Sequence, residues 1–225
     1  QIVIVQNRDD SKVLTKWNVL NYEKIRLIKG SGVQLKNFIN LEEPAGIPTV
    51  CFAARLLIDK GVNEFISAAR ILKQRQVKAK FILAGDLDKQ NPSGLKANDL
   101  QKIIEEKIVN FIGFQEDIPS LYSKSHIICL PSYREGLPKA LLEAAAAKRP
   151  IVTTNVPGCR DAIISDKSGI LVPIKDSLSL ANALQELIID ASKRKEMGKT
   201  GRELAEKEFK IENVVDKHIK IYKYL

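Results

Sequence analysis

Short apolar runs alternate with amphipathic stretches along the 225-residue chain, and this alternation constrains the fold more than any other feature. Apolar runs of four or five residues are typical of strands that are buried on both faces of a parallel sheet. Strands that alternate with helices predict an α/β fold, a Rossmann-like parallel sheet with helices on both faces. Strands are expected at residues 2–5, 25–29, 49–53, 80–84, 109–112, 127–130, 151–154 and 169–172, and helices at 61–74, 95–106, 118–123, 137–147, 178–192 and 193–208.

The composition excludes several classes of protein. A hydrophobic content of 44% with 28% charged residues is ordinary for a soluble globular chain, and no apolar run approaches the ~18 residues that a membrane span needs. Three widely spaced cysteines resemble neither a disulfide framework nor a zinc site, and a reducing cytosol fits them best. The net charge of +9 suits a phosphorylated ligand, an anionic membrane or nucleic acid. Dispersed Lys and Arg and only 6% aromatic residues argue against nucleic acid.

A stretch rich in Pro and Gly at residues 40–48 is the best internal linker. It predicts a lead-in at residues 1–40 and a main domain at residues 41–225. The chain opens inside an apolar stretch with neither Met nor a basic leader, so we expect an excised piece without a signal peptide.

The last third of the chain is helical and basic. A solvated helix face is the favoured interpretation, and contact with anionic lipid headgroups is the alternative. The basic residues are Lys193, Arg194, Lys195, Lys199, Arg202 and Lys207.

Residues 130–143 carry the most chemical information. A buried strand gives way to a polar loop and then to a helix that opens at Leu137 and Pro138, where proline suits the first turn. In an open α/β sheet this turn lies at the carboxyl edge, where ligands bind, and the free N–H groups of a helix start can hold an anion. A diphosphate would match such a site.

Two glutamates belong to this segment and lie eight positions apart. Glu135 precedes the helix, and Glu143 lies about two turns inside it, so both could face one elongated ligand. A carboxylate accepts hydrogen bonds from both hydroxyls of a vicinal diol, as in a sugar. Glu143 interrupts an apolar helix, and a buried acid needs a partner. Ligand contact is therefore favoured over a structural salt bridge.

The pattern of Glu135, seven residues and Glu143, with Gly136 after the first acid and Pro150 closing the segment, resembles the signature of retaining GT-B glycosyltransferases. The surrounding segments resemble glycosyltransferase family 4 in the same order, over roughly residues 25–172. They lie at residues 111–114, 117–121, 130–132, 150–154 and 157–162. The resemblance implies the C-terminal, donor-binding lobe of a two-lobed enzyme whose N-terminal lobe is missing.

The resemblance also implies a role for each site residue. Arg55 and Lys60, in Ala-Arg-Leu and Lys-Gly at the place of the family's two cationic motifs, would hold the diphosphate and stabilise its developing charge. Glu135 would contact donor-sugar hydroxyls and Glu143 the ribose. Backbone at Gly136, Leu137, Pro138 and Lys139 would contact sugar and phosphates, Gly113 and Phe114 the base, and Gly30 and Gly32 would pass beneath the donor. A simple turn is the alternative for the last two glycines.

The implied reaction is that of a hexosyltransferase. It would move a sugar from a nucleoside diphosphate, with UDP as a prior, to a hydroxyl of a glycan or lipid-linked acceptor with retention of configuration. Cell-surface polysaccharide biosynthesis, in the cytoplasm or peripherally at the inner face of the plasma membrane, is the expected setting. Without the acceptor lobe, donor binding without turnover is expected. A GT-B-like sugar-nucleotide epimerase or phosphorylase and a non-catalytic nucleotide-binding domain remain alternatives.

Three further features are interpreted as structural or accidental. Asp86-Leu87-Asp88 spells an acid-x-acid metal motif, but three letters occur easily by chance, and neither a metal nor a cofactor is expected. His126 is interpreted as a structural histidine. Lys148 stands where the family usually has glycine, so we expect this helix to end without a left-handed cap.

Overall fold

The computed structural model describes residues 2–17, 19–39 and 42–223. Residues 40 and 41, where the predicted linker begins and the two predicted domains meet, lie outside the described residues, as do residues 1, 224 and 225.

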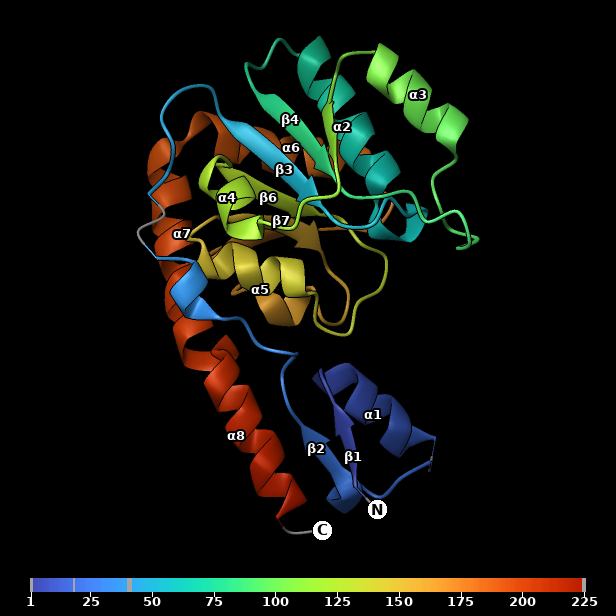
Figure 1. Ribbon diagram of the computed structural model, residues 1–225, viewed down its shortest axis with the longest axis vertical. Coiled ribbons are helices and arrows are strands. Elements are labelled where there is room, and N and C mark those ends of the chain that lie inside the picture. Colours follow the sequence, from blue (N-terminus) through green and yellow to red (C-terminus); the bar gives the residue numbers. More distant parts are fainter. Residues whose placement is uncertain (1, 18, 40–41, 224–225) are drawn as a thin grey trace.

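Six parallel strands form the main sheet in the spatial order β5-β4-β3-β6-β7-β8 (Figure 1). Chain order runs outward in both directions from the centre, with β4 and β5 on one side of β3 and the later strands on the other. Such a switch point opens a crevice outside the carboxyl ends of the central strands. The six strands predicted here are confirmed, with β5 beginning one residue late. Their bounds are β3 (Thr49–Ala53), β4 (Lys80–Ala84), β5 (Asn110–Gly113), β6 (Ile127–Leu130), β7 (Ile151–Thr154) and β8 (Gly169–Val172).

Helices cover both faces of this sheet (Figure 1). One face carries α4 and α5, which contact each other, and the other carries α2 and α6. The predicted helices are confirmed, with ends that differ by a few residues. The bounds are α2 (Val62–Gln74), α3 (Ala97–Glu105), α4 (Ile118–Ser123), α5 (Lys139–Ala146), α6 (Ser177–Ile189) and α7 (Ala191–Leu204), followed by a π-helical turn η5 (Ala205–Phe209) and α8 (Ile211–Tyr222). The Rossmann-like α/β fold is therefore confirmed.

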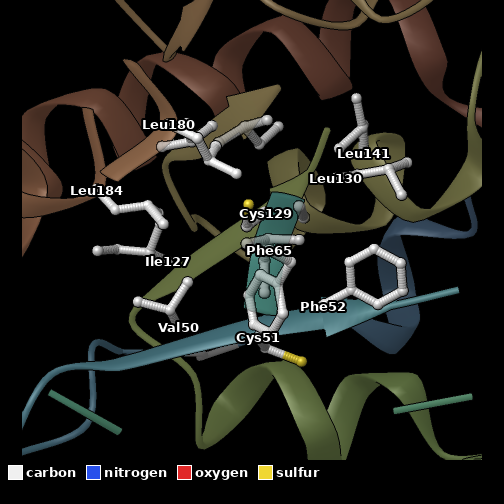
Figure 2. Packing of buried hydrophobic residues seen from close by; sticks show 14 of the residues in the cluster. Val50, Cys51, Phe52, Phe65, Ile127, Cys129, Leu130, Leu141, Leu180 and Leu184 are labelled. Carbon is white, nitrogen blue, oxygen red and sulfur yellow. The ribbon is translucent and has the colours of Figure 1, made fainter. Parts of the chain in front are cut away.

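The core lies between the sheet and its two helical layers (Figure 2). Adjacent residues of β3 point to opposite faces and are both buried, which is why this strand reads as a continuous apolar run. Phe52 packs against Phe65 of α2 with ring centroids 5.4 Å apart. His126, just before β6, accepts a 3.0 Å hydrogen bond from the N–H of Thr49, and burial lowers its pKa. Its prediction as a structural histidine is confirmed.

A small unit precedes the main body and forms its own sheet. In it β1 (Val3–Val5) pairs in parallel with β2 (Ile25–Leu27), and α1 (Arg8–Lys16) connects them. The strands were predicted, but α1 was not. At the other end of the chain, α8 extends from the main body in the direction of the small unit (Figure 1). Lys29 and Glu208 form a 3.5 Å ion pair between the segments after β2 and before α8.

The prediction for Lys148 is wrong. This residue adopts the left-handed conformation with φ +56° and closes α5 as a glycine would. The N–H of Lys148 donates to the carbonyl of Ala145 at 3.1 Å, and that of Arg149 to Ala144 at 3.0 Å, which is the Schellman arrangement. The burial of Arg149, whose guanidinium donates to the carbonyl of Tyr122 at 2.9 Å, holds the chain in this conformation. We attribute the tolerance of a lysine at this left-handed position to the anchored side chain of Arg149.

The basic C-terminal helices are only partly a solvated face. Arg194 of α7 is buried and forms a forked ion pair with Glu43 at 2.7 and 3.1 Å. Arg202 donates to the carbonyls of Phe38 and Ala146, both at 2.8 Å. The solvated-face interpretation is wrong for Arg194, because this side chain is buried against Glu43, a residue 151 positions earlier in the chain. Both arginines fasten the segment before β3 to the helical layer.

Candidate functional site

Lys60 and Glu135 meet at the carboxyl edge of the sheet. Lys60 ends a 3₁₀ turn, η3 (Ile58–Lys60), after β3, and Glu135 lies in the loop between β6 and α5. The ammonium nitrogen is 2.5 Å from Glu135 Oε1, and the two side chains are 23% and 10% exposed. A charged pair this sheltered is held in one geometry, so both groups are oriented before any ligand arrives. The structure thus brings together two of the predicted site residues.

Glu143 lies in a separate groove further along α5. The groove has a volume of about 480 Å³, and Gly32, Lys139 and Glu143 are among its lining residues. Burial raises the pKa of Glu143, and the Lys139 ammonium 3.4 Å away partly offsets that effect. The predicted need of this acid for a partner is met by an ion pair across one helical turn. Its side chain still faces the groove, where a ligand hydroxyl could reach it.

Arg55 lines a different hollow, of about 590 Å³, at the ends of β3, β4 and β5. Its guanidinium donates to Asp88 Oδ2 at 2.9 Å, and 61% of the Arg55 side chain remains exposed. Asp86 and Phe114 line the same hollow, and Phe114 presents a largely exposed ring. Asp88 therefore neutralises an arginine here. Within the described residues no group of three or more metal-ligating side chains comes together.

The loop before α5 is anchored at its start by Tyr133. The Tyr133 hydroxyl donates to Glu64 Oε1 at 2.7 Å, and its N–H donates to the carbonyl of Asp59 at 2.8 Å. The Lys175 ammonium lies 5.1 Å from the ring centroid. Burial, with help from Glu64, raises the pKa of Tyr133 and keeps the donating proton in place. These contacts fix the point from which Glu135 projects, and the sequence analysis missed them.

The end of this loop, Gly136 to Pro138, is closely packed. Leu137 is buried, so its side chain does not face a ligand, and Pro138 immediately precedes the first residue of α5. Gly158 has φ +79°, and a Cβ there would lie 2.4 Å from the carbonyl oxygen of Gly136. Gly158 is therefore a glycine because the loop crosses directly over it. Sequence reasoning included it only within a family segment.

Two predicted donor-binding glycines have distinct structural reasons. A Cβ on Gly32, at φ +74°, would lie 2.8 Å from Cα of Ile211, so this glycine lets the start of α8 cross closely. Gly113, at φ +67°, has open space where a Cβ would be, so only its left-handed backbone requires glycine. Gly32 also borders the Glu143 groove, whereas Phe114, next to Gly113, borders the Arg55 hollow.

The predicted residues thus form one extended edge rather than one cluster. Arg55 and Lys60 each bind a carboxylate of their own, and Glu135 and Glu143 lie in different surroundings. Cations and hydrogen-bond acceptors alternate along the carboxyl ends of β3, β4 and β6. Such an edge suits an elongated ligand that carries both a diphosphate and hydroxyl groups.

Comparisons with known proteins identify the fold and the family of the chain. The chain is 30% identical over 219 residues to N,N'-diacetylbacillosaminyl-diphospho-undecaprenol alpha-1,3-N-acetylgalactosaminyltransferase of Campylobacter jejuni, covering 90% of this chain and 55% of that protein. Sucrose-phosphate synthase from Thermosynechococcus elongatus superposes with a TM-score of 0.86 at 27% identity, over 99% of this chain and 58% of its own. Anabaena HepE, solved with UDP-glucose, gives 0.85 at 20% identity, over 100% and 64%.

The first curated relatives are all longer than this chain, which spans 41%, 55% and 45% of their lengths. The family profile described as glycosyl transferases group 1 matches residues 33–204, about three quarters of the chain. That range contains every site residue predicted from the sequence except Gly30 and Gly32, which lie just before it. The chain belongs to the glycosyl transferases group 1 family.

Proposed function

We propose that this chain binds the nucleoside-diphosphate sugar of a retaining GT-B glycosyltransferase, which moves the sugar to a glycan or lipid-linked hydroxyl. The observation that carries the proposal is the Lys60–Glu135 pair beside the start of α5. A cation and the free N–H groups of a helix start suit the diphosphate, and the adjacent carboxylate suits the sugar hydroxyls. The epimerase, phosphorylase and scaffold alternatives have no comparable support.

The chemistry that we assign to the site is electrostatic. Arg55, Lys60 and the backbone N–H groups at the start of α5 oppose the charge that develops on the departing diphosphate. Glu135 orients the donor sugar, and Glu143 accepts from the ribose hydroxyls. No side chain of this edge acts as a nucleophile, and the acceptor approaches from the face that the diphosphate leaves. No metal takes part in this scheme.

UDP is the nucleotide that we favour, because HepE was solved with UDP-glucose on the same fold. The exposed ring of Phe114 in the Arg55 hollow offers a surface on which a planar base can stack. A lipid-linked acceptor is favoured because the relative from Campylobacter jejuni has a diphospho-undecaprenol substrate in its name. Cell-surface polysaccharide biosynthesis is the process that joins these two substrates.

We further propose that residues 1–40 belong to the acceptor-binding lobe. A two-stranded sheet is marginally stable by itself, so β1 and β2 need more protein around them. Trp17 and Tyr22, both 72% exposed, add apolar surface to this unit. A chain that holds only this edge of the acceptor lobe would bind donor without transferring sugar, and detectable transfer by it would contradict the division at residue 40.

We propose a cytoplasmic location with peripheral contact at the inner face of the plasma membrane. In the described part of the chain, none of the helices is both long and apolar enough to cross a bilayer. Lys195 and Lys199 of α7 are exposed and border a surface hollow that Glu42 and Glu43 also line. Sedimentation with anionic and neutral vesicles tests the contact, and equal binding to both would exclude it.

The nucleotide assignment is tested by thermal unfolding of the chain with UDP, GDP and ADP. A ligand at 100 times its Kd stabilises the folded chain by ~2.7 kcal/mol, which raises the Tm of a chain this long by several degrees. Arg55→Ala and Lys60→Met should reduce the shift, whereas Arg75→Ala, on an exposed residue that contacts Asn182, should preserve it. No shift with any of the three nucleotides would support a scaffold instead.

A further inference from the structure

Asn7 is a buried polar residue that reaches from the small unit to the loop between β6 and α5, residues 131–138, which we call the donor loop. It caps α1, because its Oδ1 accepts from the N–H of Asp10 at 2.8 Å. The same side chain is 0% exposed, and its Nδ2 donates to the carbonyl of Gly136 at 3.0 Å and to the Asp10 carboxylate at 2.8 Å. A cap needs only the oxygen, so the contact between Nδ2 and Gly136 calls for a separate explanation.

Neighbouring residues dock the same segment on both sides of Asn7. A Cβ on Gly136 would lie 2.7 Å from Oε1 of Gln6, so the small unit packs directly on the glycine of the signature. Arg160, in the loop after β7, donates to Asp9 Oδ2 at 2.9 Å. The donor loop thus lies between the start of α1 and the segment around Gly158, with contacts from both sides.

The Asn7 contact also orients a backbone donor. The peptide unit that joins Gly136 to Leu137 is planar and trans, so its C=O and its N–H point in opposite directions. When Asn7 holds the Gly136 carbonyl, the N–H of Leu137 faces away from the small unit. Among the described residues this N–H finds no hydrogen-bond acceptor, so it is available to a ligand.

We propose that Asn7 is a positioning residue of the donor site, which fixes the Gly136–Leu137 peptide so that the Leu137 N–H meets the diphosphate or sugar. The inference rests on the proposed donor function of this edge. It also means that the small unit and the main body both hold the donor loop. A change in their relative orientation would then alter the geometry of bound donor through Asn7.

The test compares Asn7→Ser with wild type by calorimetric titration of UDP, GDP and ADP. Serine caps helices as well as asparagine does, but it has no amide nitrogen to donate to Gly136. A lost hydrogen bond of this kind should raise the Kd about threefold to tenfold. Asn182→Ser on α6 is the matched control, since Asn182 accepts from Arg75 on the exposed surface far from the loop in sequence. Its Kd should equal that of wild type.

A second readout is the protection of the Leu137 amide against hydrogen exchange, measured by NMR with the nucleotide that binds best at saturation. The protection should fall in Asn7→Ser and stay unchanged in Asn182→Ser. A residue that only caps α1 would change neither quantity. Should Asn7→Ser fail to fold, Asn7→Thr replaces it, because threonine also caps helices and has no amide nitrogen to donate.

The outcomes separate the two proposals. Wild-type protein that binds none of the three nucleotides contradicts the proposed function and this inference together. Wild-type binding with an equal Kd and equal Leu137 protection in Asn7→Ser contradicts only the inference.

Discussion

The Lys60–Glu135 pair gives the sharpest test of the site geometry, because it can be measured without a ligand. Breaking a buried ion pair costs about 3–5 kcal/mol, whereas exposed pairs contribute about 0.2–1 kcal/mol. The two side chains are 23% and 10% exposed, which is closer to the buried case. Lys60→Met should therefore lower the free energy of unfolding by about 2–3 kcal/mol, mainly because the Glu135 carboxylate loses its cation.

A double-mutant cycle isolates the pair. Lys60→Met, Glu135→Gln and the double variant are unfolded in urea and followed by circular dichroism, and we expect a coupling free energy of about 1–2 kcal/mol. Most of it should persist when salt rises from low to high concentration, since sheltered charges are screened weakly. Coupling within about 0.3 kcal/mol of zero would mean that the pair does not form in solution, and the proposed orientation of Glu135 would be lost with it.

Three more predictions concern the loop and the helix that carry the site. Glu143→Gln should be more stable than wild type at neutral pH, because burial raises the pKa of Glu143 in the folded chain and so penalises its charged form. The difference in Tm between the two proteins should vanish below the usual pKa of a glutamate, which a series of Tm measurements against pH would show. Gly158→Ala should cost about 2–4 kcal/mol in urea unfolding, since a Cβ meets backbone at 2.4 Å, and a loss below about 1 kcal/mol would count against the loop crossing. Lys148→Gly should gain up to about 1 kcal/mol, or a few degrees in Tm, by removing left-handed strain, and a lower Tm would contradict that reasoning.

The strands of the main sheet were predictable because burial on both faces leaves an unbroken apolar run in the sequence. Residues 49–53 and 127–130 are examples, and the structure buries nearly every residue in both. The helix α1 gives no such signal, because none of its residues is buried. Only its capping chemistry, Asn7 before two aspartates, marks it in the sequence, and that signal was available.

Pairing between distant segments was not predictable from one sequence. Arg194 looks like part of a solvated basic face until Glu43 is brought against it, 151 positions away. Lys148 looks unsuited to a left-handed cap until the anchored guanidinium of Arg149 is seen to hold the chain there. In both cases the preference read from neighbouring residues was reasonable, but a contact with a distant part of the chain had a larger effect on the free energy. The local sequence does not encode that contact.

The same limit has a consequence for the site itself. Sequence reasoning treated Arg55 and Lys60 as cations waiting for phosphate, yet each is paired with a carboxylate, and Lys139 is paired with Glu143. A bare anion that approaches this edge meets charges that are already balanced, so it must compete with Asp88 or Glu135 for its contacts. A sugar nucleotide carries hydroxyl groups that donate to those carboxylates while its phosphates take the cations. The balanced pairs therefore favour a ligand with both kinds of group over inorganic phosphate or pyrophosphate, and they make the acids as important to recognition as the bases.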